Sequence, residues 1–166
     1  MLRPMAIWAL AIDSVTNSPI LILKEIDGER TLPIWIGLLE AAAIVSGLKG
    51  VKLSSIPMTH DLLKDIMVMM AVKVNKVEIC ELRNNIYYAL VYINYNDRQI
   101  SVDARPSDAI ALSLKFSAPL FVAEDVIKKS RQLDLEMVPA DKSEQGKKWR
   151  EILESMDPAD FGKYKM

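Results

Sequence analysis

The amino-acid sequence predicts an α+β fold: a mostly antiparallel sheet, two or three packed helices and a C-terminal helix. Two observations lead to this class. Segments with the two-residue alternation of strands follow one another across short turns, as in antiparallel sheets. Three other segments, beginning at Leu38, Thr59 and Pro106, space their apolar residues with the period of a helix. The expected strands are residues 5–13, 20–24, 31–36, 73–82, 86–95, 99–103 and 118–122.

The amino-terminal third is expected to form an antiparallel meander that leads into a helix. Pro19 marks the first turn, and Asp27-Gly28 marks the second. Residues 38–48 then carry a helical spacing of apolar side chains, and Gly50 is typical of the residue that ends a helix. This helix therefore follows directly on the third strand.

Two elements in the middle of the chain are predicted to be buried. Thr59 is a good N-cap for the helix that follows it, and that helix repeats leucine, isoleucine and methionine on a broad stripe. We therefore expect the helix to be largely buried. The strand over residues 86–95 is apolar on both faces, which predicts a central strand covered on both sides.

Length and composition predict one domain, residues 1–127, followed by a tail, residues 128–166. A chain of 166 residues with 51% hydrophobic content can bury one substantial core, whereas two independent domains are not expected. Beyond the last strand we expect a short helix over 124–129, an irregular segment over 130–142 and a terminal helix over 145–156.

Charge and cysteine content limit the classes of protein to which the chain can belong. The net charge of −1 argues against strong non-specific binding of nucleic acid through lysine and arginine. The single cysteine, Cys80, excludes an intrachain disulfide and supplies no zinc-binding set, so a reduced, cytoplasmic protein is expected. No apolar run approaches the ~18 residues of a membrane span, so no membrane association is expected.

The densest group of chemically capable side chains lies where a predicted strand meets a predicted helix. Asp103, Arg105, Ser107 and Asp108 fall within six residues there. They lie beside the N–H groups at the helix start that have no partner within the helix. Such a corner can hold an anion or a metal ion, or can simply cap the helix.

Three more candidates, Glu40, His60 and Asp61, lie at the starts of the two earlier helices. If the three helix starts converge, the carboxylates of Glu40, Asp61, Asp103 and Asp108 supply the oxygen ligands that Mg²⁺ or Mn²⁺ prefers. We therefore name these four residues as candidate metal ligands.

A hydrated cation at this place would bind a phosphodiester and activate water, and an arginine would stabilise the negative charge that develops on the phosphate. The candidate catalytic residues are accordingly His60, Asp103, Arg105 and Asp108, with Ser107 as a further candidate.

Each of these residues also has a purely structural interpretation. Acidic side chains at helix starts are stabilised by the helix dipole by roughly 0.3–1 kcal/mol without any other role. Ser107 can bond the backbone, and Asp103 with Arg105 can form a local ion pair. A lone histidine beside a helix cap, such as His60, is often structural or solvated.

Four motifs in order along residues 5 to 127 resemble the bifunctional nuclease family. They are LPIWIG at 32–37 with Glu40, PMTHDLL at 57–63, VDARPSDAIAL at 102–112, and Ala118-Pro119 before a strand. The resemblance implies a compact α+β domain that tends to self-associate. For the plant members of the family it implies nuclease activity on both DNA and RNA. Plant members also carry a carboxy-terminal motif like that of excision-repair nucleases, which residues 130–166 do not resemble.

Two functional hypotheses follow. The first is a metal-assisted nuclease that cleaves DNA and RNA with carboxylates at the helix starts holding the cation. The second is a non-catalytic, dimeric binding or regulatory module whose polar motifs maintain the fold. A homodimer is expected in either case, because the methionine-rich helix, Trp149 and Phe161 can bury an interface and edge strands pair readily. The distances between Glu40, His60, Asp103 and Asp108 separate the two hypotheses.

Overall fold

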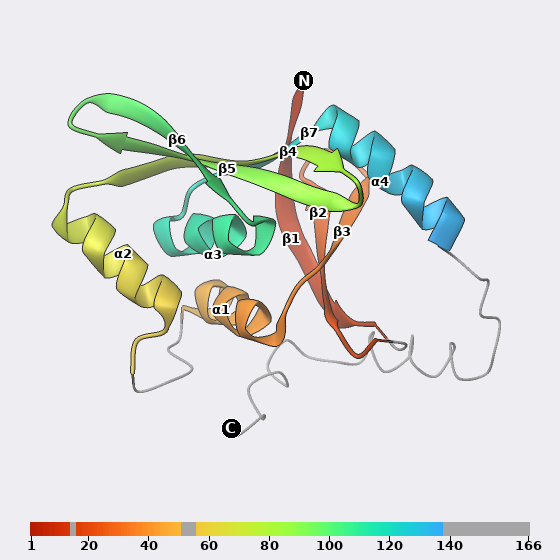
Figure 1. The fold of residues 1–166 in the computed structure, drawn as a ribbon, viewed down its shortest axis with the longest axis horizontal. Helices are drawn as coiled ribbons and strands as arrows, with labels where there is room; N and C mark the ends of the chain where they lie inside the picture. The colour runs from red at the N-terminus through yellow and green to blue at the C-terminus, as the bar shows by residue number, and fades with distance from the viewer. Residues whose placement is uncertain (14–15, 51–55, 138–166) are drawn as a thin grey trace.

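A computed structural model describes residues 1–13, 16–50 and 56–137 of the chain, and this part contains seven strands and four helices (Figure 1). The predicted α+β class is therefore confirmed. The strands are β1 (Leu2–Ile12), β2 (Pro19–Glu25), β3 (Thr31–Trp35), β4 (Lys73–Arg83), β5 (Ile86–Tyr95), β6 (Arg98–Ala104) and β7 (Leu120–Ala123). The helices are α1 (Leu38–Lys49), α2 (Thr59–Met69), α3 (Pro106–Phe116) and α4 (Glu124–Met137).

The strands form one sheet in the order β3-β2-β1-β7-β4-β5-β6. All neighbouring pairs are antiparallel except β4 and β7, which run parallel. The short strand β7 therefore joins the predicted amino-terminal meander to a second meander, β4-β5-β6. The crossover that parallel pairing requires is supplied by the segment that contains α3.

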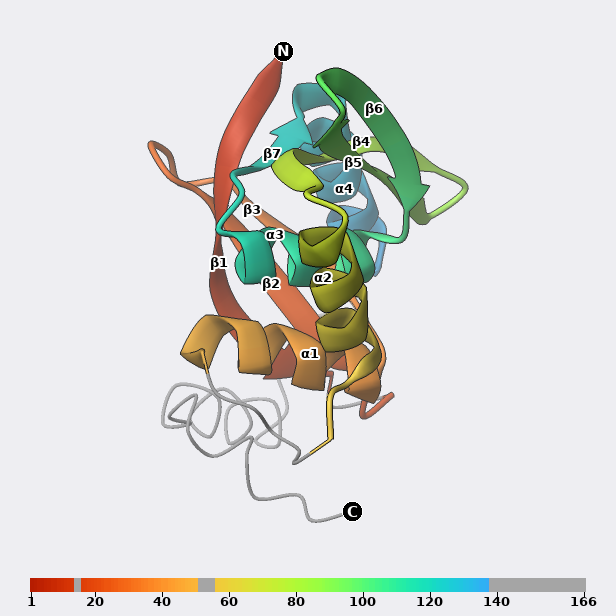
Figure 2. The same ribbon diagram turned by 90° about the vertical axis from the view of Figure 1, so that its left-hand side faces the viewer.

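Helix α3 packs against the sheet, and α1 packs against α3 (Figures 1 and 2). Residues 109–112 of α3 are all buried, and Ile110 is fully enclosed. A Cβ atom added at Gly47 of α1 would lie 2.9 Å from the Cβ of Leu114, so glycine allows the two helices to approach closely. This packing brings the starts of α1 and α3 to the same side of the molecule.

The residues at which α1 ends and α3 begins and ends are set by the backbone preferences of the residues located there. Gly50 adopts a left-handed conformation, with φ 61°, directly after α1, as predicted. Pro106 occupies the first turn of α3, where its missing N–H costs nothing. Ser117 ends α3 in the left-handed region.

The prediction that the helix after Thr59 is largely buried is wrong. No residue of α2 is buried, and Met69 is 86% exposed. Thr59 is also not the N-cap: the helix is preceded by Met58, whose N–H donates to the Asp61 carboxylate at 3.0 Å. The apolar stripe of α2 is real, but the described residues cover only part of it: Met67 packs against the core, whereas Leu63 and Ile66 are 40% and 45% exposed.

Two further expectations are corrected. One face of β5 packs on α3, but the other is only partly covered, and Tyr88 on it is 36% exposed, so β5 is not covered on both sides by the described residues. Helix α4 continues to Met137, so residues 130–137 are helical rather than irregular. The predicted terminal helix over 145–156 lies outside the described residues. Among the described helices, none combines the length and the apolar character that crossing a membrane requires.

Candidate active site at the start of α3

Arg105 lies between the end of β6 and the first turn of α3. Its backbone is extended (φ −70°, ψ 146°), and its carbonyl accepts the first helical hydrogen bond, from the Ala109 N–H at 3.0 Å. The fixed φ of Pro106 then starts the helix directly after it. The Arg105 side chain consequently projects from a rigid strand-to-helix junction.

The Arg105 guanidinium binds carboxylates from two helices. Its Nε and Nη2 atoms donate to the two oxygens of Asp108 at 2.7 and 3.1 Å, and its Nη1 lies 3.0 Å from Glu40 Oε1 on α1. The hydrogen bonds with Asp108 raise the pKa of Arg105. The Arg105 side chain is nevertheless 67% exposed, so these contacts hold it at the surface rather than bury it.

His60, at the start of α2, completes the group. Its Nε2 atom lies 3.0 Å from Asp108 Oδ1, and only 14% of its side chain is exposed. Burial by itself raises the pKa of Asp108, but hydrogen bonds from Arg105 and His60 outweigh it and hold that pKa below its ordinary value. Asp108 is therefore ionised at neutral pH. We call Glu40, His60, Arg105 and Asp108 the Arg105 cluster.

The Arg105 cluster carries excess negative charge. Two carboxylates face one guanidinium, which leaves one net negative charge when His60 is neutral. An anionic ligand at Arg105 is therefore attracted by the guanidinium and repelled by its carboxylate partners. Protonation of His60 would remove the excess.

The remaining three candidates, Asp61, Ser107 and Asp103, are not part of the Arg105 cluster. Asp61 pairs with Lys115 on α3 and accepts the Met58 N–H, so it ties α2 to α3. Ser107 is buried beneath the junction. Asp103 is exposed on β6, opposite Leu90 of β5.

The position of Asp103 follows from strand geometry. Successive side chains of a strand alternate between its faces, so Asp103 points away from the face of Val102 and Ala104. Burial raises the pKa of the Cys80 thiol on β4, and the charge of Asp103 adds a small contribution after those of Glu78 and Glu81. Asp103 therefore belongs to the face of the sheet that carries Cys80.

The predicted four-carboxylate metal site is not assembled. In residues 1–13, 16–50 and 56–137, no group of three or more His, Cys, Asp or Glu side chains has an arrangement that could hold a metal ion. Glu40 and Asp108 are both engaged by Arg105, and Asp61 is engaged by Lys115. The donor set as it stands does not fit Mg²⁺ or Mn²⁺.

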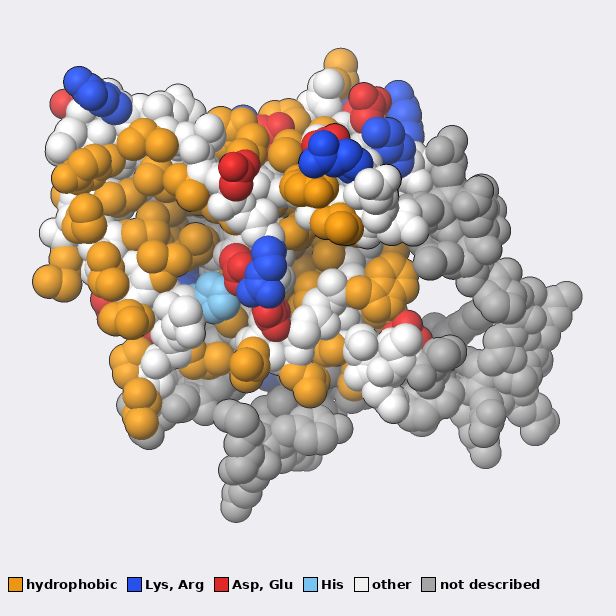
Figure 3. Space-filling model, viewed as in Figure 1, with side chains coloured by type: hydrophobic (Ala, Val, Ile, Leu, Met, Phe, Trp, Pro, Cys, Tyr) orange, Lys and Arg blue, Asp and Glu red, His pale blue; other side chains and the backbone are white. Residues whose placement is uncertain are grey.

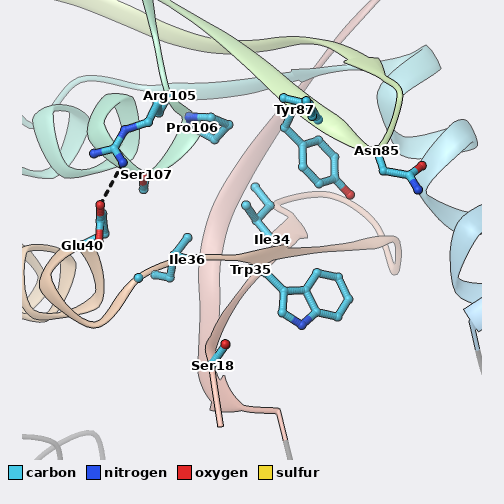
Figure 4. Close-up of a pocket in the computed structure, with 12 residues that line it drawn as sticks. Ser18, Ile34, Trp35, Ile36, Glu40, Asn85, Tyr87, Arg105, Pro106 and Ser107 are labelled. Carbon is cyan, nitrogen blue, oxygen red and sulfur yellow. Dashed lines mark ion pairs between the residues drawn. The ribbon is translucent and has the colours of Figure 1, made fainter. Parts of the chain in front are cut away.

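An open cavity of about 400 Å³ lies beside the Arg105 cluster (Figure 4). Arg105 and Glu40 border it on one side, and Trp35 of β3 and Tyr87 of β5 lie on the other. Ser107 also lines it. The size falls within the range of roughly 300–1,000 Å³ of ligand pockets, and an apolar wall with a few polar groups is typical of them.

Reasoning from the sequence missed Trp35, Tyr87 and Lys115. The Lys115 side chain is 8% exposed and forms an ion pair with Asp61. The two residues are 54 positions apart in the sequence, so no local pattern could predict this pair. Trp35 lies inside a motif that was noticed, but its role depends on facing the cavity, which only the packing of β3 determines.

Comparison with known proteins agrees with the four motifs. The family model of the bifunctional nuclease domain matches residues 21–134. The chain belongs to this family. The match includes all four residues of the Arg105 cluster.

Individual relatives extend the comparison. The chain is 37% identical over 158 residues to the uncharacterized protein Rv1829 of Mycobacterium tuberculosis, covering 92% of this chain and 93% of the relative. It is 26% identical over 113 residues to bifunctional nuclease 1 of Oryza sativa subsp. indica, covering 66% of this chain and 34% of the rice protein. The bifunctional nuclease of Oryza minuta gives the same values.

Proposed function

We propose that the chain is a nuclease that hydrolyses phosphodiester bonds of DNA and RNA at the Arg105 cluster. The observation that carries the proposal is an exposed arginine that lines a cavity and shares the carboxylate of Asp108 with a histidine, in a member of the bifunctional nuclease family. The rice relatives named as bifunctional nucleases support the choice of substrate.

In this proposal Arg105 binds the phosphate. Its planar fork of N–H groups matches phosphate oxygens, and 67% of its side chain is open to solvent. As negative charge develops on the phosphorane, the guanidinium stabilises it. The N–H groups at the start of α3 add a positive potential at the same place.

His60 moves the proton. When its Nε2–H donates to Asp108, the Nδ1 atom carries the lone pair and accepts a proton from the attacking water. Asp108 fixes the ring and stabilises the imidazolium that forms, as a carboxylate does for a catalytic histidine in other hydrolases. The water oxygen bonds to phosphorus, the bond from phosphorus to the leaving oxygen breaks, and the leaving oxygen takes a proton from solvent while the imidazolium later returns its proton to solvent.

Dependence on Mg²⁺ or Mn²⁺ stays a prediction. Because the described donors do not fit either ion, we derive no step through a metal. Assays of purified protein in EDTA and after addition of each ion test the prediction directly: activity that survives EDTA contradicts it.

Substitution of Asp108 tests the proposal. Asp108→Asn should abolish release of fluorophore from labelled RNA and DNA, while the melting temperature changes little. Asp65→Asn, at an exposed carboxylate on α2 outside the cluster, is the matched control and should retain activity. Equal activity of both variants and the wild type, or no activity in any of them, would contradict the proposal.

The uncovered face of α2 favours self-association as well. Hydrophobic side chains gather on the side of the molecule that carries α2 and the β5–β6 turn (Figure 3). Patches of this extent on a soluble domain mark interaction surfaces. The large exposed hydrophobic residues of α2, the residue after it and β6 are Leu62, Leu63, Ile66, Val68, Met69, Met70, Ile100 and Val102.

We propose that a second copy of this chain covers this hydrophobic surface, because the edge strand β6 of one copy is suited to pair with β6 of the other. The β5–β6 turn consists of two residues with positive φ (49° and 59°), so the flanking Tyr95 and Arg98 form a hydrogen-bonded pair. The backbone groups of Gln99, Ser101 and Asp103 then face the open edge, where an antiparallel strand can bond them.

Apolar pairing selects the register. With the two-fold axis at Ser101, Ile100 of one copy lies opposite Val102 of the other. These two side chains are 43% and 45% exposed in the single chain, and the pairing would cover both. The α2 faces of the two copies then extend the contact beside the paired strands.

Light scattering on a sizing column tests the dimer. The wild type should elute with the mass of two chains, and Ile100→Lys with the mass of one. Ile26→Lys, a change at a residue that is equally hydrophobic and 61% exposed in another part of the surface, should remain dimeric. A monomeric wild type at micromolar concentration contradicts this proposal. A protein that is both monomeric and inactive would contradict the nuclease proposal and also the second hypothesis, that of a non-catalytic dimeric binding module.

A further inference from the structure

The wall of the cavity opposite Arg105 carries an exposed indole. Trp35 ends β3 and is 47% exposed, although tryptophan is a residue that folding usually covers. It lines the same cavity as Arg105, and in Figure 4 the two side chains lie on opposite sides of the open space. A cavity with a cation at one side and a flat aromatic ring at the other suits a ligand with an anionic and a planar part.

The indole is held in place rather than free to turn away. Its Nε1–H donates to Asp13 Oδ2 at 3.0 Å, and the backbone of Trp35 pairs with Ile20 of β2. Because the polar edge of the ring is bonded, the exposed part is an apolar face. An aromatic ring fixed in this way loses little conformational entropy when a second ring stacks on it.

The negative charge of the Arg105 cluster weakens anion binding at Arg105, so binding of a polyanion requires a contribution from another residue. The carboxylates of Glu40 and Asp108 oppose an anion at Arg105, so the guanidinium alone is a poor source of affinity for a polyanion. Stacking does not depend on the charge of the protein. A base that stacks on Trp35 therefore supplies binding that the cluster itself lacks.

We infer that Trp35 stacks on an unpaired base of a single-stranded nucleic acid whose phosphate lies at Arg105. The inference rests on the proposed function and specifies its substrate: single strands over duplexes. In a duplex both faces of each base are stacked on neighbouring bases, whereas a single strand can turn a face toward an aromatic platform. Because every base has such a face, binding should depend weakly on sequence.

Binding of a cleavage-resistant ligand tests the inference. A fluorescent phosphorothioate oligothymidylate is titrated with full-length protein, and anisotropy gives the dissociation constant. Trp35→Ala should weaken binding by about tenfold, and Trp35→Phe should restore most of it because a phenyl ring also stacks. Trp8→Ala is the matched control, since Trp8 is 63% exposed on β1 and lines a different cavity.

A phosphorothioate duplex of the same length completes the experiment. It should bind more weakly than the single strand and respond equally little to both alanine variants. If the single strand binds Trp35→Ala as tightly as the wild type, or if the duplex binds as tightly as the single strand, the inference is wrong while the nuclease proposal stands. If neither ligand binds and neither normal DNA nor RNA is cleaved, the nuclease proposal fails too. Circular dichroism of Trp35→Phe and Trp35→Ala checks that both variants are folded.

Discussion

Two arginines in this molecule are each held between two carboxylates, and they differ in what they leave exposed. Arg30 donates to Glu25 Oε1 at 2.5 Å and to Glu124 Oε1 at 2.8 Å, and 23% of its side chain is exposed. Arg105 binds Glu40 and Asp108 at similar distances, but 67% of its side chain is exposed. The same ion-pair chemistry therefore occurs once in a covered setting and once in an open one.

The covered network ties the fold together. Glu124 at the start of α4 also accepts a hydrogen bond from Arg3 of β1, at 2.6 Å, so three segments distant in sequence meet there. Hydrogen bonds from Arg30 and Arg3 lower the pKa of Glu124 to about 2. The open network adds what the covered one lacks, a histidine on the shared carboxylate. Exposure and a titratable partner, rather than ion pairing itself, mark the Arg105 cluster as a candidate site.

The largest expected effect is on activity. Arg105→Ala should lower the cleavage rate by roughly 100-fold or more, since it removes the donors that stabilise charge on the phosphate. The melting temperature should stay close to that of the wild type because the guanidinium is mostly exposed. Initial rates on labelled RNA and a thermal melt measure both quantities. Full activity in this variant would remove the distinction between the two arginines.

The second effect is on stability, in the other network. Arg30→Met should lower the melting temperature by several degrees, because Glu25 and Glu124 would keep their charges without their main partner. The cleavage rate per folded molecule should not change. A variant that melts like the wild type but loses activity would reverse our assignment of the two clusters.

Acid should weaken the covered network in a defined pH window. Because the pKa of Glu124 is lower in the folded chain than its ordinary value of 4.5, its contribution to stability is fully present above that value. The contribution is lost as the pH falls from about 4.5 toward about 2. Urea melts across this range should show a smaller pH dependence for Glu124→Gln than for the wild type. Parallel curves for the two proteins would contradict the prediction.

The smallest effect is expected at Asp103. Asp103→Asn should change the free energy of unfolding by less than about 0.5 kcal/mol, because the residue is an exposed carboxylate on β6. The cleavage rate should also remain close to that of the wild type, since Asp103 points to the face of the sheet opposite to that of Val102 and Ala104 and forms no ion pair with the Arg105 cluster. A loss of activity as large as that expected for Arg105→Ala would place Asp103 in the site after all.

Most strands and helices could be predicted because their signals are local. The left-handed Gly50 and the helix-starting Pro106 act within one turn of chain, and the alternation of side chains in β4 needs only the neighbouring residues. The exposure of α2 could not be predicted in the same way. An apolar stripe shows that a helix has a face to cover, but not whether the cover comes from its own chain.

The candidate site was predictable in part for a similar reason. The starts of α1, α2 and α3 do converge, bringing together Glu40, His60, Arg105 and Asp108. Asp61 follows His60 directly, and consecutive residues of a helix point about 100° apart, so both could not face Asp108.

The single histidine of the chain offers the most direct test of the central claim, that nucleic acid binds at the Arg105 cluster. Because His60 has the only imidazole, its carbon-bound ring protons give NMR signals that need no assignment. Titration with the phosphorothioate oligothymidylate should shift these signals in a saturable manner, with the same dissociation constant as anisotropy. Arg105→Ala should abolish the shift. If the signals stay in place while anisotropy shows the oligonucleotide fully bound, nucleic acid binds elsewhere and the account is wrong.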